Sequence, residues 1–294
     1  MKNIAVAMGG ISAEREISLA SGRAIAEALA ALGTYRVTPV DVTSEAFDLP
    51  ADVDVVFIAL HGTYGEDGGV QAYLAAKGIP FTGSDAQSSR IAFDKVLSKQ
   101  CFEKHGVNTA RYEVLRHGQP RTLPLPVVVK PPRQGSSIGL AIVTREEDWA
   151  GALATALTFD PEVMVETYIP GRELTIGIVG DEVLPVVEIR APGGNYDYKA
   201  KYTKGATEYL CPAPLDDETT RMVQHLAWKT FIALKSSGLG RVDIRLTDEG
   251  VAYVLELNSI PGCTETSLLP KAAKAAGISF PALCDKIVRQ ILPS

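Results

Sequence analysis

The residues whose types and spacing could most plainly do chemistry lie near the C-terminus, in the segment Arg241–Asn258. Two apolar runs flank the acid–glycine dipeptide at 249–250, and a glycine in the second position favours a two-residue hairpin turn. Mirroring the chain about that turn places Asp243 opposite Glu256. It also places Arg241 opposite Asn258, and because side chains alternate between the faces of a strand, all four share one face.

Two facing carboxylates on one face of a hairpin predict a bound cation. Directly opposed residues have β-carbons ~4.5–5.5 Å apart, so the two acids repel each other unless a positive charge lies between them. Oxygen donors without His or Cys favour a hard ion such as Mg²⁺. The alternative is a solvated face on which Arg241 and Arg245 pair the acids. With Asn258 on the same face and Gly262 shortly after it, the metal site is the favoured interpretation.

A second segment is the glycine- and serine-rich stretch from Lys130 to Gly139. The amides and hydroxyls of Gly135, Ser136 and Ser137 can cradle phosphate oxygens, because glycine allows the backbone to approach a ligand closely. Lys130, at the end of a predicted strand, supplies a positive charge. The stretch differs from a Walker A loop, in which the lysine follows the glycines. Taken alone, it is more often only a turn.

Two further loops follow N-terminal strands. In the first, Gly9-Gly10 leads into Glu14 and Glu16 at the start of a helix, where acids either contribute to a ligand site or simply stabilise the helix dipole. The spacing is not G-x-G-x-x-G, so a dinucleotide site is only weakly supported. The second loop begins at His61, at a strand end where open α/β sheets place their ligands. A single histidine beside glycines is nevertheless often only a loop residue.

The elements that must position these residues change character along the chain. Over the first ~85 residues strands and helices alternate, which predicts a small doubly wound parallel sheet. The predicted strands there cover 4–8, 35–42, 53–60 and 78–82, and the helices cover 13–32 and 70–77. The remainder is predicted as α+β, with strands over 126–130, 139–143, 163–168, 174–179 and 183–189, helices over 90–105, 146–157 and 218–236, then two strands and a terminal helix.

Composition excludes several classes of protein. The chain has 294 residues and a net charge of −6, which argues against a bulk binder of nucleic acid or anionic membranes. The four cysteines are widely spaced, so neither a zinc knuckle nor a dense disulfide framework is indicated. No apolar run approaches the ~18 residues of a membrane span. We therefore expect a soluble, cytoplasmic protein.

Taken together, these segments resemble the D-alanine–D-alanine ligases of the ATP-grasp superfamily, and the resemblance extends along nearly the whole chain. The motifs that carry it are Gly-Gly-x-Ser-Ala-Glu14-Arg-Glu-x-Ser, His61-Gly-x-x-Gly-Glu66-Asp-Gly, Asp94-Lys95, Val-Lys130-Pro-x-Arg-x-Gly-Ser136-Ser137-x-Gly, Tyr198-Lys-Ala-Lys201-Tyr202, Gly-Arg241-Val-Asp243 and Glu256-x-Asn258-x-x-Pro-Gly262. The sequence departs from the family pattern at Gln134, where the family often has Glu, and at Ser259-Ile260.

The resemblance implies a fold and an activity. The fold would be an N-terminal α/β substrate domain at 1–89, followed by a two-part ATP-grasp region with a central part at 90–170 and a C-terminal part at 171–294. The enzyme would join two D-alanines with ATP through a D-alanyl phosphate, making D-alanyl-D-alanine for peptidoglycan. Two Mg²⁺ or Mn²⁺ ions would assist. The expected partners are therefore ATP and D-alanine, and a homodimer would fit the family.

The resemblance also implies roles for individual residues. The nucleotide would contact Lys95, Lys130, Ser136, Ser137, Glu166, Tyr168, Ile169, Glu173 and Lys201. The metal ions would be held by Asp243, Glu256 and Asn258. The two D-alanines and the reacting groups would be handled by Glu14, His61, Ser136, Lys201, Tyr202, Arg241, Gly262 and Ser267.

Three alternatives remain at this point. The chain could be a D-alanine–D-lactate or D-alanine–D-serine ligase, which shares the chemistry and changes the acceptor. Tyr202 resembles the dipeptide-forming branch, so D-alanine is favoured. A different ATP-grasp ligase is opposed by the match around Glu14. A non-catalytic nucleotide sensor would not need Arg241, Asp243, Glu256 and Asn258 all together.

Overall fold

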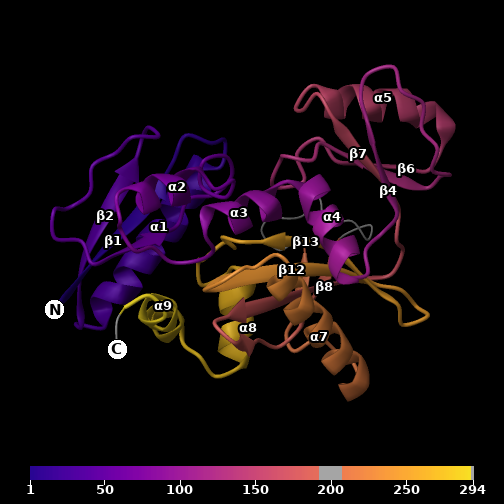
Figure 1. The fold of residues 1–294 in the computed structure, drawn as a ribbon. Coiled ribbons are helices and arrows are strands. Elements are labelled where there is room, and N and C mark those ends of the chain that lie inside the picture. Colours follow the sequence, from indigo (N-terminus) through magenta and orange to yellow (C-terminus); the bar gives the residue numbers. More distant parts are fainter. Residues whose placement is uncertain (192–206, 293–294) are drawn as a thin grey trace.

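A computed structural model describes residues 1–191 and 207–292 of the chain. Lys201 and Tyr202, for which the sequence predicts roles, lie outside the described residues. The described part contains three sheets, each with helices beside it (Figure 1). Each sheet lies within one of the ranges 1–89, 90–170 and 171–294, and the division of the chain into three domains at those boundaries stays a prediction.

The N-terminal sheet is parallel and has the strand order β2-β1-β3. Its central strand is almost wholly apolar and buried, as expected for a strand covered on both faces. Only one parallel bridge, between Val56 and Phe81, stands where the sequence predicts a fourth strand. The elements of this part are β1 (Lys2–Gly9), α1 (Arg15–Ala31), β2 (Tyr35–Val42), β3 (Val55–Ile58) and α2 (Gly69–Ala76).

The middle sheet is antiparallel, with the order β4-β7-β5-β6, and helix α5 packs against it. Its core is a separate apolar cluster whose buried residues are mostly valines. Strand β4 is not predicted from the sequence, because its four residues are too few to show a periodic pattern. The elements are β4 (Tyr112–Leu115), β5 (Val127–Lys130), β6 (Ala141–Val143), α5 (Glu146–Leu157) and β7 (Val163–Thr167).

The third sheet is also antiparallel, with the order β11-β10-β8-β12-β13, and β9 pairs with β8 beside this path. The predicted single terminal helix is two helices, α8 and α9. The elements are β8 (Arg172–Val179), β9 (Glu182–Val183), β10 (Val187–Arg190), β11 (Glu208–Leu210), α7 (Asp217–Ala233), β12 (Leu239–Leu246), β13 (Ala252–Asn258), α8 (Leu268–Ala275) and α9 (Phe280–Arg289).

The single helix predicted over 90–105 is broken in two. Helix α3 (Ala86–Phe93) ends at Asp94, whose backbone is extended at φ −84° and ψ 107°, and α4 (Lys95–His105) begins directly after it. The Asp94 carboxylate accepts from the amides of Val96 and Leu97 and so caps the second helix. Because of this break, Lys95 stands at the first position of α4.

The hairpin of β12 and β13 contains the predicted residue pairs, although its turn differs from the predicted one. Asp243 lies opposite Glu256 and Arg241 lies opposite Asn258. The predicted two-residue turn is wrong: the Thr247 amide donates to the carbonyl of Val251, leaving a three-residue loop. The extra loop residue shifts the strand register by one. A bulge at Leu255, opposite the step from Asp243 to Ile244, shifts the register back.

The first and last parts of the chain share one core. A single apolar cluster joins residues of β1, α1 and β3 to residues of α8 and α9. In Figure 1, α9 accordingly lies beside α1, next to the N-terminal sheet. The Tyr35 hydroxyl donates to Asp285 of α9 over 2.6 Å.

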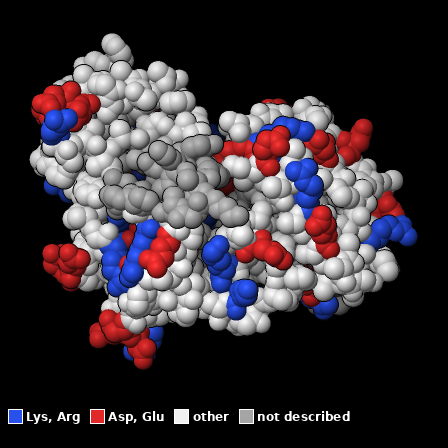
Figure 2. Space-filling view, turned by 180° about the vertical axis from the view of Figure 1, so that it is seen from behind, with Lys and Arg blue, Asp and Glu red and all other residues white. Residues whose placement is uncertain are grey.

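Two properties of the described residues bear on possible partners. None of their helices is long and apolar enough to cross a membrane. On the face drawn in Figure 2, basic and acidic side chains are interspersed, and the described residues there form no continuous basic surface.

Candidate active site

The described residues with predicted site roles line two cavities that meet. One lies between the middle and third sheets, and the other lies between the N-terminal sheet and the third sheet. The residues that line both cavities are Lys95, Gln134, Ser136 and Glu256. A group bound in one cavity can therefore be passed to a group bound in the other across these four side chains.

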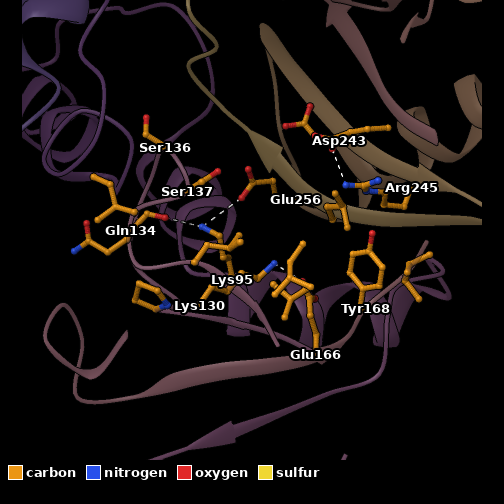
Figure 3. Close-up of a pocket in the computed structure, with 18 of the residues that line it drawn as sticks. Lys95, Lys130, Gln134, Ser136, Ser137, Glu166, Tyr168, Asp243, Arg245 and Glu256 are labelled. Carbon is orange, nitrogen blue, oxygen red and sulfur yellow. Dashed lines mark hydrogen bonds and ion pairs between the residues drawn. The ribbon is translucent and has the colours of Figure 1, made fainter. Parts of the chain in front are cut away.

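The first cavity gathers the described residues that the sequence assigns to the nucleotide. Its lining includes Lys95, Lys130, Ser136, Ser137, Glu166, Tyr168, Ile169 and Glu173. Figure 3 shows Asp243 and Glu256 on one side of this cavity, with Glu166 and Tyr168 on the other. Apolar side chains from β5, β6 and β13, including Val128, Ile142 and Leu255, complete the walls. Leu255 is the residue that the bulge in β13 adds.

Charged side chains at the back of this cavity are buried and paired. Lys130 donates to one oxygen of the Glu166 carboxylate, and the Lys99 ammonium lies 2.7 Å from the other oxygen. Burial alone would raise the pKa of Glu166, but the two ammonium groups outweigh burial and lower it to about 2. Glu166 is therefore ionised at neutral pH.

Glu173, the predicted ribose contact, is also paired with a cation. The Arg245 guanidinium lies 2.9 Å from the Glu173 carboxylate, and it donates to the carbonyl of Gly171 over 3.0 Å. Arg245 thus pairs with an acid of the neighbouring strand β8.

The acids predicted to bind metal are held by cations of the chain. Asp243 accepts two bonds of 2.9 Å from Arg241, one of 2.5 Å from the Thr175 hydroxyl and one of 3.1 Å from the Asn258 amide. Glu256 lies 3.3 Å from the Lys95 ammonium. The pairing of Asp243 by Arg241 is what the alternative of a salt-bridged face predicts.

The same arrangement fits a hard cation. Two carboxylates on directly paired positions are held close together, and both attract positively charged groups. Within residues 1–191 and 207–292 no cluster of three His, Cys, Asp or Glu side chains is formed, so Asn258 would supply the third donor. Its amide nitrogen faces Asp243 here, and the side chain would turn to present its oxygen.

The loop between β5 and β6 closes over the junction of the two cavities. Ser136 and Ser137 both have left-handed backbones, with φ of 50° and 57°, which is rare for residues other than glycine. The Ser136 hydroxyl donates to the Glu14 carboxylate across the junction. A β-carbon on Gly135 would lie 2.9 Å from the same carboxylate, so only glycine leaves Glu14 its place.

His61 is buried at the second cavity, where its ring links helix α1 to the segment after β13. Its ring Nδ1 lies 3.1 Å from the carbonyl of Ile260, and its Nε2 lies 3.1 Å from the Ser21 hydroxyl. Because a carbonyl only accepts, Nδ1 carries the proton and Nε2 accepts from Ser21. Burial lowers the pKa of His61, which keeps the ring neutral. This histidine thereby fixes the segment before Gly262.

Gly262 and Ser267 lie together at the far end of the second cavity. A β-carbon on Gly262 would come within 3.3 Å of the Ser267 hydroxyl. Ser267 is the N-cap of α8, so the positive end of this helix dipole faces the cavity. A carboxylate is the ligand group that such a helix end attracts.

All the described residues with predicted site roles line one cavity or the other, although their individual roles stay predictions. Two charged residues were not predicted to act. Glu66 lines the second cavity, and burial, with the nearby Glu14 charge, raises its pKa to about 8, so it is mostly protonated at neutral pH. Lys99 lies four residues after Lys95, a spacing that places both on one face of α4 and could have indicated it.

Comparison with known proteins gives the same family along the whole chain. A family model described as the D-ala D-ala ligase C-terminus matches residues 95–289, and one described as the D-ala D-ala ligase N-terminus matches residues 41–84. The chain is 49% identical to a D-alanine–D-alanine ligase of Methylacidiphilum infernorum over 287 residues, which cover 98% of this chain and 94% of that protein.

Solved structures agree with the sequence comparison. A D-alanine–D-alanine ligase from Bacillus anthracis complexed with ATP superimposes with a TM-score of 0.87 at 34% identity, covering 98% of this chain and 97% of that one. The VanG D-Ala:D-Ser ligase from Enterococcus faecalis superimposes with a TM-score of 0.87 at 29% identity, covering 99% of each chain.

Proposed function

Because this chain belongs to the D-alanine–D-alanine ligase family, we propose that it joins two D-alanines to D-alanyl-D-alanine at the expense of ATP. The observation that carries this proposal is the junction of the two cavities at Lys95, Gln134, Ser136 and Glu256. A ligase of this kind must pass a phosphoryl group from a nucleotide to an amino acid carboxylate, and the junction gives that transfer a place. The dipeptide would serve peptidoglycan synthesis.

The reaction needs two steps that balance in atoms and charge. A carboxylate oxygen of the first D-alanine attacks the γ-phosphorus of ATP, which gives a D-alanyl phosphate and releases ADP. The amine of the second D-alanine then attacks the acyl carbon, phosphate leaves, and the nitrogen loses a proton. The closed loop at 131–139 keeps water from the acyl phosphate between these steps.

The nucleotide half of the site is suited to a polyanion. Lys95 and Lys130 supply positive charge, and the left-handed backbones of Ser136 and Ser137 turn that loop towards the cavity. Mg²⁺ held by Asp243, Glu256 and Asn258 would neutralise the charge on the phosphates during transfer. Lys95 would then be released from Glu256 to a phosphate oxygen.

The amino acid half is suited to two zwitterions. The Glu14 carboxylate, held by Ser136, would accept from the ammonium of the first D-alanine. Arg241 and the Gly262 amide would donate to the oxyanion that forms at the acyl carbon. Ser267 and the N-terminus of α8 would bind the carboxylate of the second D-alanine.

The test is an incubation with ATP, Mg²⁺ and D-alanine, with phosphate release measured and the product identified by its mass. We expect phosphate release that depends on D-alanine and a dipeptide as the product. Parallel incubations with added D-serine or D-lactate test the acceptor, and a mixed dipeptide or a depsipeptide as the main product would overturn it. Tight nucleotide binding without any phosphate release would instead support a sensor.

A further inference from the structure

At the wall of the nucleotide cavity lies a buried group of three charged side chains, Lys99, Lys130 and Glu166, which we call the lysine–glutamate cluster. The side chains are only 1%, 8% and 3% exposed, respectively. Both ammonium groups face the one carboxylate, each at a different oxygen. The cluster therefore holds one more positive charge than negative charge in the interior.

The two lysines differ in their access to the cavity. Lys130 lines the cavity together with Glu166, whereas Lys99 does not. The Lys99 ammonium also donates to the carbonyl of Ala110 over 3.0 Å and lies 5.6 Å from the centre of the Tyr112 ring. Lys99 is thus fixed from several sides, and Lys130 is the member that can turn towards a ligand.

The two lysines together carry more charge than Glu166 can neutralise. A carboxylate shared by two ammonium groups is more than compensated, while each lysine receives only part of one negative charge. In agreement with this, the pKa of Glu166 is lowered despite its burial, while burial lowers the pKa of Lys99 against the opposing effect of Glu166. A buried group with excess positive charge is stabilised by a further anion.

We propose that Lys99 is a positioning residue for nucleotide binding: it holds Glu166 in place so that Lys130 can leave that carboxylate for a nucleotide phosphate. Without Lys99, the departure of Lys130 would strand a buried carboxylate without a counter-charge. The proposal rests on the proposed function, because it takes ATP as the ligand of the first cavity. It concerns a residue that does not itself reach the nucleotide.

The experiment measures the affinity for ADP with Mg²⁺ by titration calorimetry. Lys99→Met keeps the apolar length of the side chain and removes the ammonium, and we expect ADP to bind about 10- to 100-fold more weakly. Lys104→Met is the matched control, because Lys104 is on the same helix and exposed. The control should bind ADP like the unmodified protein. Turnover at saturating ATP should fall much less than affinity.

A second pair of variants separates positioning from a general structural role. In the Glu166→Gln background Lys130 has no carboxylate to leave, so adding Lys99→Met should leave the ADP affinity within about 3-fold of the Glu166→Gln parent. Equal losses in both backgrounds would overturn the proposal, as would unchanged affinity in folded Lys99→Met. If Lys99→Met alone does not fold, the two Glu166→Gln proteins still decide, since an ADP affinity at least 10-fold weaker in the double variant than in the parent overturns the proposal.

The same proteins distinguish this proposal from the proposed function. D-alanine-dependent phosphate release by the unmodified protein tests the ligase activity alone. ADP affinity tests the lysine–glutamate cluster alone, because it needs neither D-alanine nor turnover. If the unmodified protein released no phosphate with D-alanine but the ADP affinities changed as expected, the ligase assignment would be wrong and the role of Lys99 would stand.

Discussion

At the scale of single residues, the acids that line the first cavity are already paired with basic side chains of the chain. Asp243 is held by Arg241, Glu256 by Lys95, Glu166 by two lysines and Glu173 by Arg245. Under the proposed function, we therefore expect a phosphate or metal ion that binds one of these paired groups to replace an internal ion pair. A charge removed by mutation then changes the protein without ligand as well as its complex.

Glu256 is the residue at which this exchange should be most visible. Glu256→Gln keeps the shape and an oxygen donor, but removes the negative charge that pairs with Lys95 and that would help to hold the metal ion. We expect turnover to fall at least about 10³-fold, with the fold intact, because transition-state charge loses its neutralising ion. The measurement is D-alanine-dependent phosphate release over a series of Mg²⁺ concentrations.

Glu249→Gln is the control for this change, because Glu249 is an exposed acid in the loop of the same hairpin. It should leave both turnover and Mg²⁺ dependence unchanged. Near-normal phosphate release by Glu256→Gln would remove Glu256 from the metal site.

Glu166 should make the stability of the protein depend on pH. Its pKa of about 2 in the folded state lies below the ordinary value of 4.5, so the ionised form stabilises the fold above pH 4.5. This contribution is on the order of 3 kcal/mol and is lost as the pH falls from about 4.5 to about 2. Urea unfolding of the native protein and Glu166→Gln should differ most near pH 7.

The difference in the free energy of unfolding should then narrow below pH 4.5. Glu27→Gln, which changes an exposed acid of α1, controls for the loss of one negative charge. A difference that stayed constant from pH 7 down to pH 3 would show that Glu166 is held by its shape and not by its charge.

At the scale of elements, hydrophobic patterning predicts most helices and strands, but it misses a helix cap and a β-bulge. Asp94 breaks the helix predicted over 90–105, because its carboxylate caps α4 better than its backbone continues α3. The predicted β12–β13 pairs are correct although the predicted turn is wrong. The register shift from the three-residue loop is cancelled by the opposite shift from the bulge at 255. Neither device has a periodic signal in the sequence.

The loop between β5 and β6 offers a test at this scale. Gly135→Ala would place a methyl group 2.9 Å from the Glu14 carboxylate, which must then move away from Ser136. We expect the KM for the first D-alanine to rise about 10-fold, since Glu14 loses part of an ion pair and hydrogen bond there. The KM for ATP should change far less.

Gly151→Ala is the matched control, because Gly151 lies within α5 with open space around its α-carbon. It should leave both constants unchanged and raise the stability by about 0.5–1 kcal/mol. Equal rises of both KM values in Gly135→Ala would instead show that the substitution disturbs the whole loop.

At the scale of the molecule, the contacts between sequence-distant parts were the least predictable. The motifs indicated which residues meet at the site, but nothing in them indicated that α9 packs on α1 or that Tyr35 bonds to Asp285. The reason is that one apolar helix face can pack against many others, so its sequence does not specify its neighbour. A site, in contrast, needs particular residue types, which can be read from the sequence. One core joins the first and third parts, while the middle sheet keeps its own.

This division of cores predicts how the molecule should melt. Without ligand, we expect calorimetry to show the middle sheet unfolding first, since its core is separate and small. The nucleotide cavity is lined by Lys130 and Ile142 of that sheet and by Glu173 and Arg245 of the third sheet, so a bound nucleotide ties the two together. ADP with Mg²⁺ at ~100 times its dissociation constant should stabilise the bound state by about 2.7 kcal/mol. The first transition should therefore move up by several degrees and merge with the second.

D-alanine alone should not cause the merger, because the second cavity is built mainly from the parts that already share a core. Two transitions that shift together by the same amount would contradict this account, since the nucleotide would then be binding a unit that was already cooperative.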